Sequence, residues 1–136
     1  MKRRALLLLA AVLGGCASTS QLDEARRVID AGRPEEGLAR LEELSTQNPG
    51  NAQYRVAFAS QRELVINRWL AEAEGSRSAG AYPHAQALYQ RVLALSPGHA
   101  RATAGLALID AERRADQLVE RARADLKKND TASAQA

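Results

Sequence analysis

The residues of this 136-residue chain that could carry out chemistry are few and scattered. Its two histidines, His84 and His99, each lie beside an expected turn, and neither has a second His, Cys or carboxylate at metal-ligand spacing. The acidic pairs Glu35-Glu36 and Glu42-Glu43 alternate with Arg40, which is typical of an exposed helix face. No serine lies in a Gly-x-Ser-x-Gly context, and no glycine-rich phosphate loop occurs. We therefore expect a protein that is not an enzyme, with no catalytic residue, metal, cofactor or small-molecule substrate.

The single cysteine, Cys16, directly follows a segment with the composition of a secretory signal. Residues 2–4 are basic, residues 5–13 are apolar, and Gly14 and Gly15 precede the cysteine. A signal of this kind has a basic start, an apolar stretch shorter than the roughly 20 residues of a bilayer span, and small residues at the cut. The sequence predicts a cleaved signal over residues 1–15. Ordinary cleavage near Ala17, leaving a soluble protein with an unpaired thiol, is the alternative.

The residues Leu13, Gly14, Gly15 and Cys16 resemble a lipobox, in which the cysteine thiol receives a diacylglycerol. The resemblance implies lipidation at Cys16, a short tether over residues 16–20 and permanent membrane attachment through more than one acyl chain. In Gram-negative lipoproteins an Asp after the cysteine retains the protein in the inner membrane. This chain has Ala17 there, so the resemblance implies the outer membrane, with the protein facing the periplasm.

Charge and composition narrow the class of protein. Three of the 19 Lys and Arg residues lie in residues 1–15, which hold no acidic residue, so the remaining chain carries 16 basic and 16 acidic side chains. Both signs are interspersed without a basic block, which argues against nucleic-acid binding. The remainder is rich in Ala, Leu, Glu and Arg, which are strong helix formers. The sequence predicts an all-α fold.

The sequence after the signal nearly repeats itself with a period of about 48 residues. Ala31-Gly32 recurs as Ala79-Gly80, and Pro49-Gly50 recurs as Pro97-Gly98. The glycines suit the left-handed residue that ends one helix, and the prolines end the next helix because they push the preceding residue out of the helical region. Each copy is therefore predicted to be a helical hairpin, and such hairpins must stack to bury their apolar faces.

The stretch from the turn glycine to the closing proline has the same length in both copies. With a small residue five positions after the glycine and a large one nine after it, this stretch resembles the second half of a tetratricopeptide repeat. An aromatic and a small residue also fall where that motif places them in its first helix. The matching positions are Gly32, Leu41, Pro49, Trp69, Ala73, Gly80, Ala85, Tyr89 and Pro97.

The period is longer than that of the family, which is about 34 residues. The additional residues amount to about four helical turns. They lie in elongated first helices, which we expect over residues 52–78 and 100–127.

The last elongated helix has apolar residues spaced by three or four. These are Leu108, Ala111, Ala115, Leu118, Ala122 and Leu126. They suit a further repeat or a coiled-coil contact with another chain. We expect the helical repeats to cover residues 21–128. Residues 129–136 are then the start of a third copy, with Asn129 as its left-handed cap, in a chain that is the front piece of a longer protein; a disordered tail is the alternative.

Several stretches look like the amino-terminal part of lipoprotein secretins of type II secretion and type IV pilus-like systems. They are the lipobox with residues 22–25, and residues 36–42, 48–55 and 89–98. The resemblance implies protein partners in the secretion or pilus machinery, with self-association also conceivable, and no pore in this segment. Two alternatives remain open: a stand-alone tetratricopeptide lipoprotein, acting as a pilotin or an outer-membrane assembly factor, and a module that localises a cell-wall hydrolase.

Overall fold

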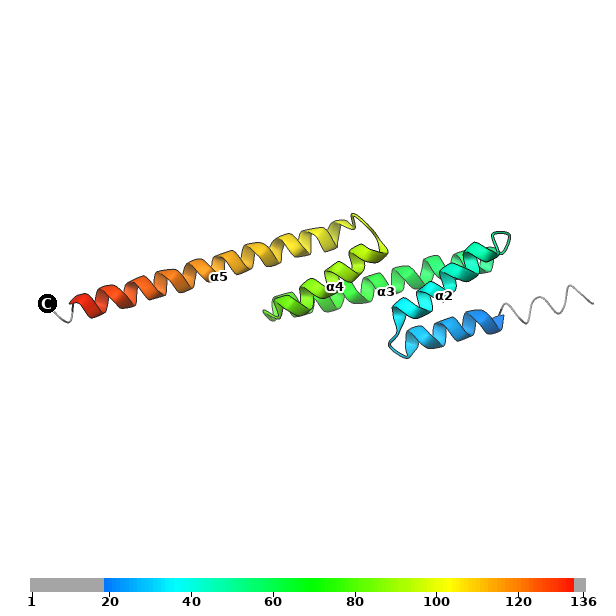
Figure 1. Ribbon diagram of the computed structural model, residues 1–136, viewed down its shortest axis with the longest axis horizontal. Helices are drawn as coiled ribbons and strands as arrows, with labels where there is room; N and C mark the ends of the chain where they lie inside the picture. Colours follow the sequence, from blue (N-terminus) through cyan, green and yellow to red (C-terminus); the bar gives the residue numbers. More distant parts are fainter. Residues whose placement is uncertain (1–18, 134–136) are drawn as a thin grey trace, which may run out of the picture. The chain divides into compact units, whose positions relative to one another are not determined.

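The computed structural model describes the backbone of residues 19–133, and all its regular structure is helical (Figure 1). The elements are a helix over residues 19–30, α2 (Pro34–Gln47), α3 (Ala52–Ser78), α4 (Tyr82–Leu95) and α5 (Ala100–Ser133). No strand occurs among these residues. The predicted all-α class, built from helical hairpins, is therefore confirmed. Residues 19 and 20, which we assigned to the tether, are already helical.

The repeat of the sequence is visible in the element boundaries. Helix α4 begins and ends one full period after α2, and α5 begins one full period after α3. Both predicted turn glycines are left-handed, with φ of +82° at Gly32 and +75° at Gly80. The backbone bonds around them also match: the Arg33 N–H donates to Val28 O, and the Ala81 N–H donates to Ser76 O. Pro49 and Pro97 lie in the turns after α2 and α4, as predicted.

The chain forms two compact units, Met1–Val65 and Ile66–Ala136, here called unit 1 and unit 2. Helix α3 contributes its first half to unit 1 and its second half to unit 2. In unit 1 the helix of residues 19–30 and α2 approach closely at Gly37. A Cβ added to Gly37 would lie 2.4 Å from Cγ1 of Ile29 and 2.7 Å from the carbonyl oxygen of Ala25. Glycine is therefore required there by packing, since both neighbours are buried.

The core of unit 2 consists of apolar side chains from all three of its helices. They are Ile66, Trp69, Leu70 and Ala73 of α3, Ala85, Leu88, Tyr89 and Val92 of α4, and Ala102 and Ile109 of α5. Trp69 is 3% exposed, and the guanidinium carbon of Arg91 lies 4.1 Å from its ring centroid. The Tyr89 ring lies directly against Gly105, where a Cβ would come within 2.2 Å of it. The aromatic and small residues predicted from the repeat motif are thus core residues.

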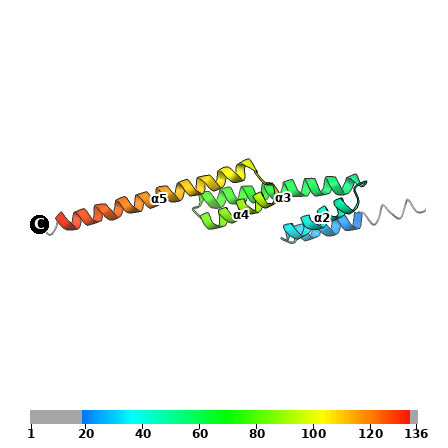
Figure 2. The same ribbon diagram turned by 45° about the horizontal axis from the view of Figure 1, so that its top comes forward.

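Helix α5 is longer than predicted. It continues as a helix through Ser133, so the end expected near residue 127 and the left-handed cap expected at Asn129 are both wrong. No Gly or Pro follows Gly105 in the sequence, and asparagine alone does not stop a helix. Within unit 2, α5 extends well past the ends of α3 and α4 (Figures 1 and 2).

Candidate functional site

The side chains that could take part in a reaction or bind a metal do not come together in one site in the described part of the chain. His84 is exposed, with Nε2 3.0 Å from Oε1 of Glu72. In α2 the Glu36 carboxylate forms surface ion pairs with Arg33 and Arg40, at 2.9 Å each. Among the described side chains, those of residues 19–128, no cluster of three potential metal ligands occurs. The predicted lipidation residue and its lipobox, residues 13–16, lie outside the described residues.

The repeat residues predicted from the sequence serve the fold. Leu41, Ala73 and Ala85 are completely buried, and Tyr89 is 1% exposed. They cannot contact a ligand without unfolding the hairpin that contains them. The candidate site therefore has to be found among exposed residues.

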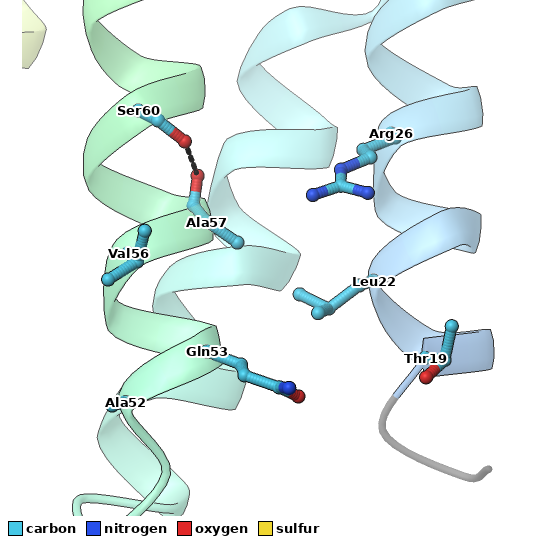
Figure 3. A pocket seen from close by; sticks show the side chains of 8 residues that line it. All are labelled: Thr19, Leu22, Arg26, Ala52, Gln53, Val56, Ala57 and Ser60. Atoms are coloured by element: carbon cyan, nitrogen blue, oxygen red, sulfur yellow. Dashed lines mark hydrogen bonds between the residues drawn. The ribbon is translucent and has the colours of Figure 1, made fainter. Parts of the chain in front are cut away.

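The most defined concavity is a groove of about 460 Å³ in unit 1 between the helix of residues 19–30 and the start of α3 (Figure 3). Its lining residues are Thr19, Leu22, Arg26, Ala52, Gln53, Val56, Ala57 and Ser60. Leu22 and Ala57 form a buried apolar base, and Val56 presents an apolar side chain that is 67% exposed. The Ser60 hydroxyl donates to the Ala57 carbonyl at 3.2 Å, so its hydrogen stays on its own helix. The surface available to a ligand is mainly apolar.

Arg26 is the one charged residue that lines this groove. Figure 3 shows its guanidinium extending from the helix of residues 19–30 into the space beside α3. Nη1 lies 3.6 Å from Oδ1 of Asp23 on the same helix, longer than a hydrogen-bonded ion pair, and the side chain is 49% exposed. The Arg26 guanidinium therefore retains N–H donors directed at the groove.

In unit 2 the positions equivalent to Arg26 and Gln53 are occupied by an ion pair. The residues one full period after Arg26 and Gln53 are Glu74 and Arg101. Arg101 Nη2 lies 2.8 Å from Glu74 Oε1, so an ion pair joins α3 directly to α5. In unit 1 the charge at the first position is reversed, and a neutral amide occupies the second. The carboxylate that would pair with the cation between these two helices is missing from unit 1.

A second, smaller hollow in unit 1 lies between the helix of residues 19–30 and α2. It is lined by Gln21, Glu24, Ala25, Arg40, Glu43 and Leu44. Arg40 bridges it, with Nη1 2.9 Å from Glu24 and Nη2 2.9 Å from Glu36. Arg40, the one cation that lines it, is already ion-paired within the chain, so this hollow offers a ligand less than the groove does.

Sequence reasoning missed the groove and Arg26. It concentrated on what the two copies share, whereas the groove depends on where they differ. The signal that could have revealed it is the charge reversal between Arg26 and Glu74 at equivalent positions. At these positions the ion pair that joins α3 to α5 in unit 2 has no counterpart in unit 1.

No protein-family model, curated protein or solved structure matches this chain. Among residues 19–133 no helix combines the length and the hydropathy that a bilayer crossing requires.

Proposed function

We propose that this chain is an outer-membrane-anchored, periplasmic helical-repeat scaffold that binds protein partners, in protein secretion or pilus assembly, as the amino-terminal part of a secretin-like protein. The repeats are of tetratricopeptide type, and Cys16 carries the lipid. The observation that carries the proposal is the open, mainly apolar groove of unit 1. It lies between the helix of residues 19–30 and α3, which are the first helices of two successive hairpins. Helical repeats commonly use such surfaces to hold partner segments.

The groove indicates the chemistry of the segment that it holds. Leu22, Ala57 and Val56 offer apolar contact, and Arg26 offers a cation at the edge. A partner segment with an apolar side chain next to a carboxylate satisfies both. It supplies the acid that Glu74 supplies to Arg101 in unit 2.

The membrane part of the proposal depends on the signal segment, because the described helices provide no span. Labelled palmitate is expected to enter the wild-type chain and not a Cys16→Ser variant, since serine offers no thiol for the thioether. Label in the variant would contradict lipidation at Cys16.

Photo-cross-linking in the bacterium that encodes the chain tests the docking proposal. A photoreactive amino acid at Val56 in the full chain is expected to give adducts with a component of the secretion or pilus machinery, identified by mass spectrometry. Leu64 of the same helix is the matched control, because it is 61% exposed against 67% for Val56 and does not line the groove. Equal adduct yields at both positions would contradict a docking site in the groove.

A pilotin or outer-membrane assembly factor is the second candidate function, and the same experiment distinguishes it. Adducts with nascent outer-membrane proteins, or with a secretin encoded by another gene, would favour that alternative, whereas the secretin-like proposal expects adducts with periplasmic components other than a separate secretin.

A further inference from the structure

The second half of α5 carries an apolar stripe that nothing in the described chain covers. Leu118 is 64% exposed, Val119 48% and Leu126 65%, and Ala115 before them and Ala122 among them are exposed too. Leu108, 49% exposed, extends the stripe towards the start of the helix. Contiguous exposed apolar surface on a helix marks an interaction site.

The stripe on α5 matches, in sequence, the face of α3 that is buried in the core of unit 2. Four core residues of α3 have apolar equivalents in α5, all at one constant spacing along the chain. The pairs are Ile66 and Ala115, Trp69 and Leu118, Leu70 and Val119, and Ala73 and Ala122. In α3 this face is covered by α4, whose Arg91 stacks over Trp69. The stripe on α5 is therefore built to pack against a helix.

The charges that flank the stripe are arranged symmetrically about the bond between Val119 and Glu120. On one edge, Arg114 and Asp125 lie equally far before and after that point and have opposite signs. On the other edge the same relation holds, in the same register, for Glu112 with Lys127 and for Asp116 with Arg123. Two identical helices that pack antiparallel bring each edge against the same edge of the partner. Each of these residues then faces a residue of opposite charge. Glu112 and Arg123 also keep their ion pairs within the chain, with Arg77 and Glu120.

We propose that α5 pairs antiparallel with α5 of a second copy of this chain, centred between Val119 and Glu120. The pairing buries Leu118 against Ala122 of the other copy, twice by symmetry, and places Val119 next to its own equivalent. A self-complementary patch of this kind is what a two-fold interface requires. The two chains' α4-covered segments lie at opposite ends of the paired helices, because α4 begins at Tyr82, whose ring centroid lies 5.8 Å from the guanidinium carbon of Arg113, before the centre of the pairing.

Cysteine cross-linking of the purified full chain in solution tests orientation and register. Cys16 is the only native cysteine, so Cys16→Ser in the full chain provides a thiol-free background. Val119→Cys in that background is expected to give disulfide-linked dimers on mild oxidation. Leu126→Cys, with its two thiols roughly 20 Å apart along antiparallel helices at 1.5 Å per residue, is expected to stay monomeric.

Each other result overturns the proposal. Dimers at both positions indicate parallel pairing. No dimer at Val119→Cys, with its thiol protected from maleimide, indicates that another helix of this chain or a different protein covers the stripe. No dimer with a freely reactive thiol shows that the stripe is uncovered.

Charge substitutions test the pairing without touching the core, because Arg114 and Asp125 are both exposed. Arg114→Glu or Asp125→Arg alone places like charges opposite each other twice, and is expected to raise the dimer Kd about tenfold in sedimentation equilibrium. The double variant restores opposite signs and is expected to recover the wild-type Kd within about twofold.

Leu118→Glu should abolish the dimer, whereas Leu64→Glu, with a similar exposed fraction of 61% against 64%, should not. Single charge variants that dimerise as well as the wild type, or a double variant that stays as weak as the singles, would overturn the antiparallel register.

Discussion

At the scale of single residues, the two repeats fill equivalent core positions with side chains of different size. Tyr89 and Gly105 in unit 2 correspond, one full period earlier, to Leu41 and Ala57 in unit 1. All four residues are buried or nearly so. The larger ring of Tyr89 is accommodated because its neighbour on α5 has no Cβ. The core thus tolerates a change in either residue only when the other changes with it.

Gly105→Ala is expected to lower the free energy of unfolding by up to about 2 kcal/mol. Overpacking against the buried Tyr89 ring costs roughly 1–3 kcal/mol, which outweighs the better helix propensity of alanine, about 1 kcal/mol. Adding Tyr89→Leu recreates the pair found in unit 1 and should recover part of the loss. Urea unfolding of the four variants in a double-mutant cycle measures this coupling. A Gly105→Ala single variant more stable than the wild type would contradict the close contact.

Much of the residue-level architecture could be predicted from the sequence. The repeat of Gly32 at Gly80 and of Pro49 at Pro97 was sufficient to place the turns, because these two residue types restrict the backbone directly. The exposed positions could not be predicted in this way, because exposure depends on which copy has a neighbour. Arg26 and Glu74 occupy equivalent helix positions, yet only the folded structure shows that one lines a groove and the other is paired.

At the scale of elements, turn geometry distinguishes two glycines that both have open space around them. Gly75 and Gly80 both have open space where a Cβ would lie, but Gly80 has φ of +75° whereas Gly75 lies within α3. The two positions therefore separate backbone strain from side-chain packing.

Gly75→Ala is expected to raise the free energy of unfolding by up to about 1 kcal/mol through helix propensity. Gly80→Ala is expected to lower it by about 1–2 kcal/mol, because a left-handed backbone is unfavourable for alanine. Thermal and urea unfolding of both variants provide the comparison. A stabilising effect at Gly80 would show that the turn between α3 and α4 is not left-handed.

The contact between α4 and α5 ends at a titratable group. The pKa of the Tyr82 phenol is raised above its ordinary value of 10.0, first by desolvation and then by the carboxylates of Asp116 and Glu112. The folded state thus favours the neutral phenol. Its contribution to stability is complete below the unfolded-state pKa and is lost as the pH rises through the higher folded-state pKa.

Tyr82→Phe should remove this contribution to the fall in unfolding free energy above pH 10. Urea unfolding between pH 8 and 11 of the wild type and the variant isolates it, and phenolate absorbance identifies the group that titrates. Titration of Tyr82 at or below the ordinary tyrosine value would contradict its desolvation by α5.

At the scale of the whole molecule, the account depends on differences between two copies of one hairpin. Unit 2 joins its first helices through the Arg101–Glu74 ion pair, whereas unit 1 leaves the same position open, with Arg26 at its edge. Helix α5 carries a further helix-binding face. The repeat pattern predicted helices over residues 52–78 and 100–127, and the first matches α3. Helix α5 continues past residue 127, where no Gly or Pro marks a boundary, and the first helix begins at residue 19, inside the predicted tether. We accordingly assign function to the positions at which the two copies of the hairpin differ.

The most direct test of this account places the ion pair of unit 2 into unit 1. The double variant Arg26→Glu/Gln53→Arg recreates the Glu74 and Arg101 side chains at their equivalent positions, and should join the helix of residues 19–30 to α3. The measurement is the yield of photo-adducts from Val56 in cells, with the free energy of unfolding determined on the same variants. We expect the adduct yield to fall at least tenfold while the stability is unchanged or slightly higher. An adduct yield equal to that of the wild type, with the protein folded, would contradict docking at Arg26.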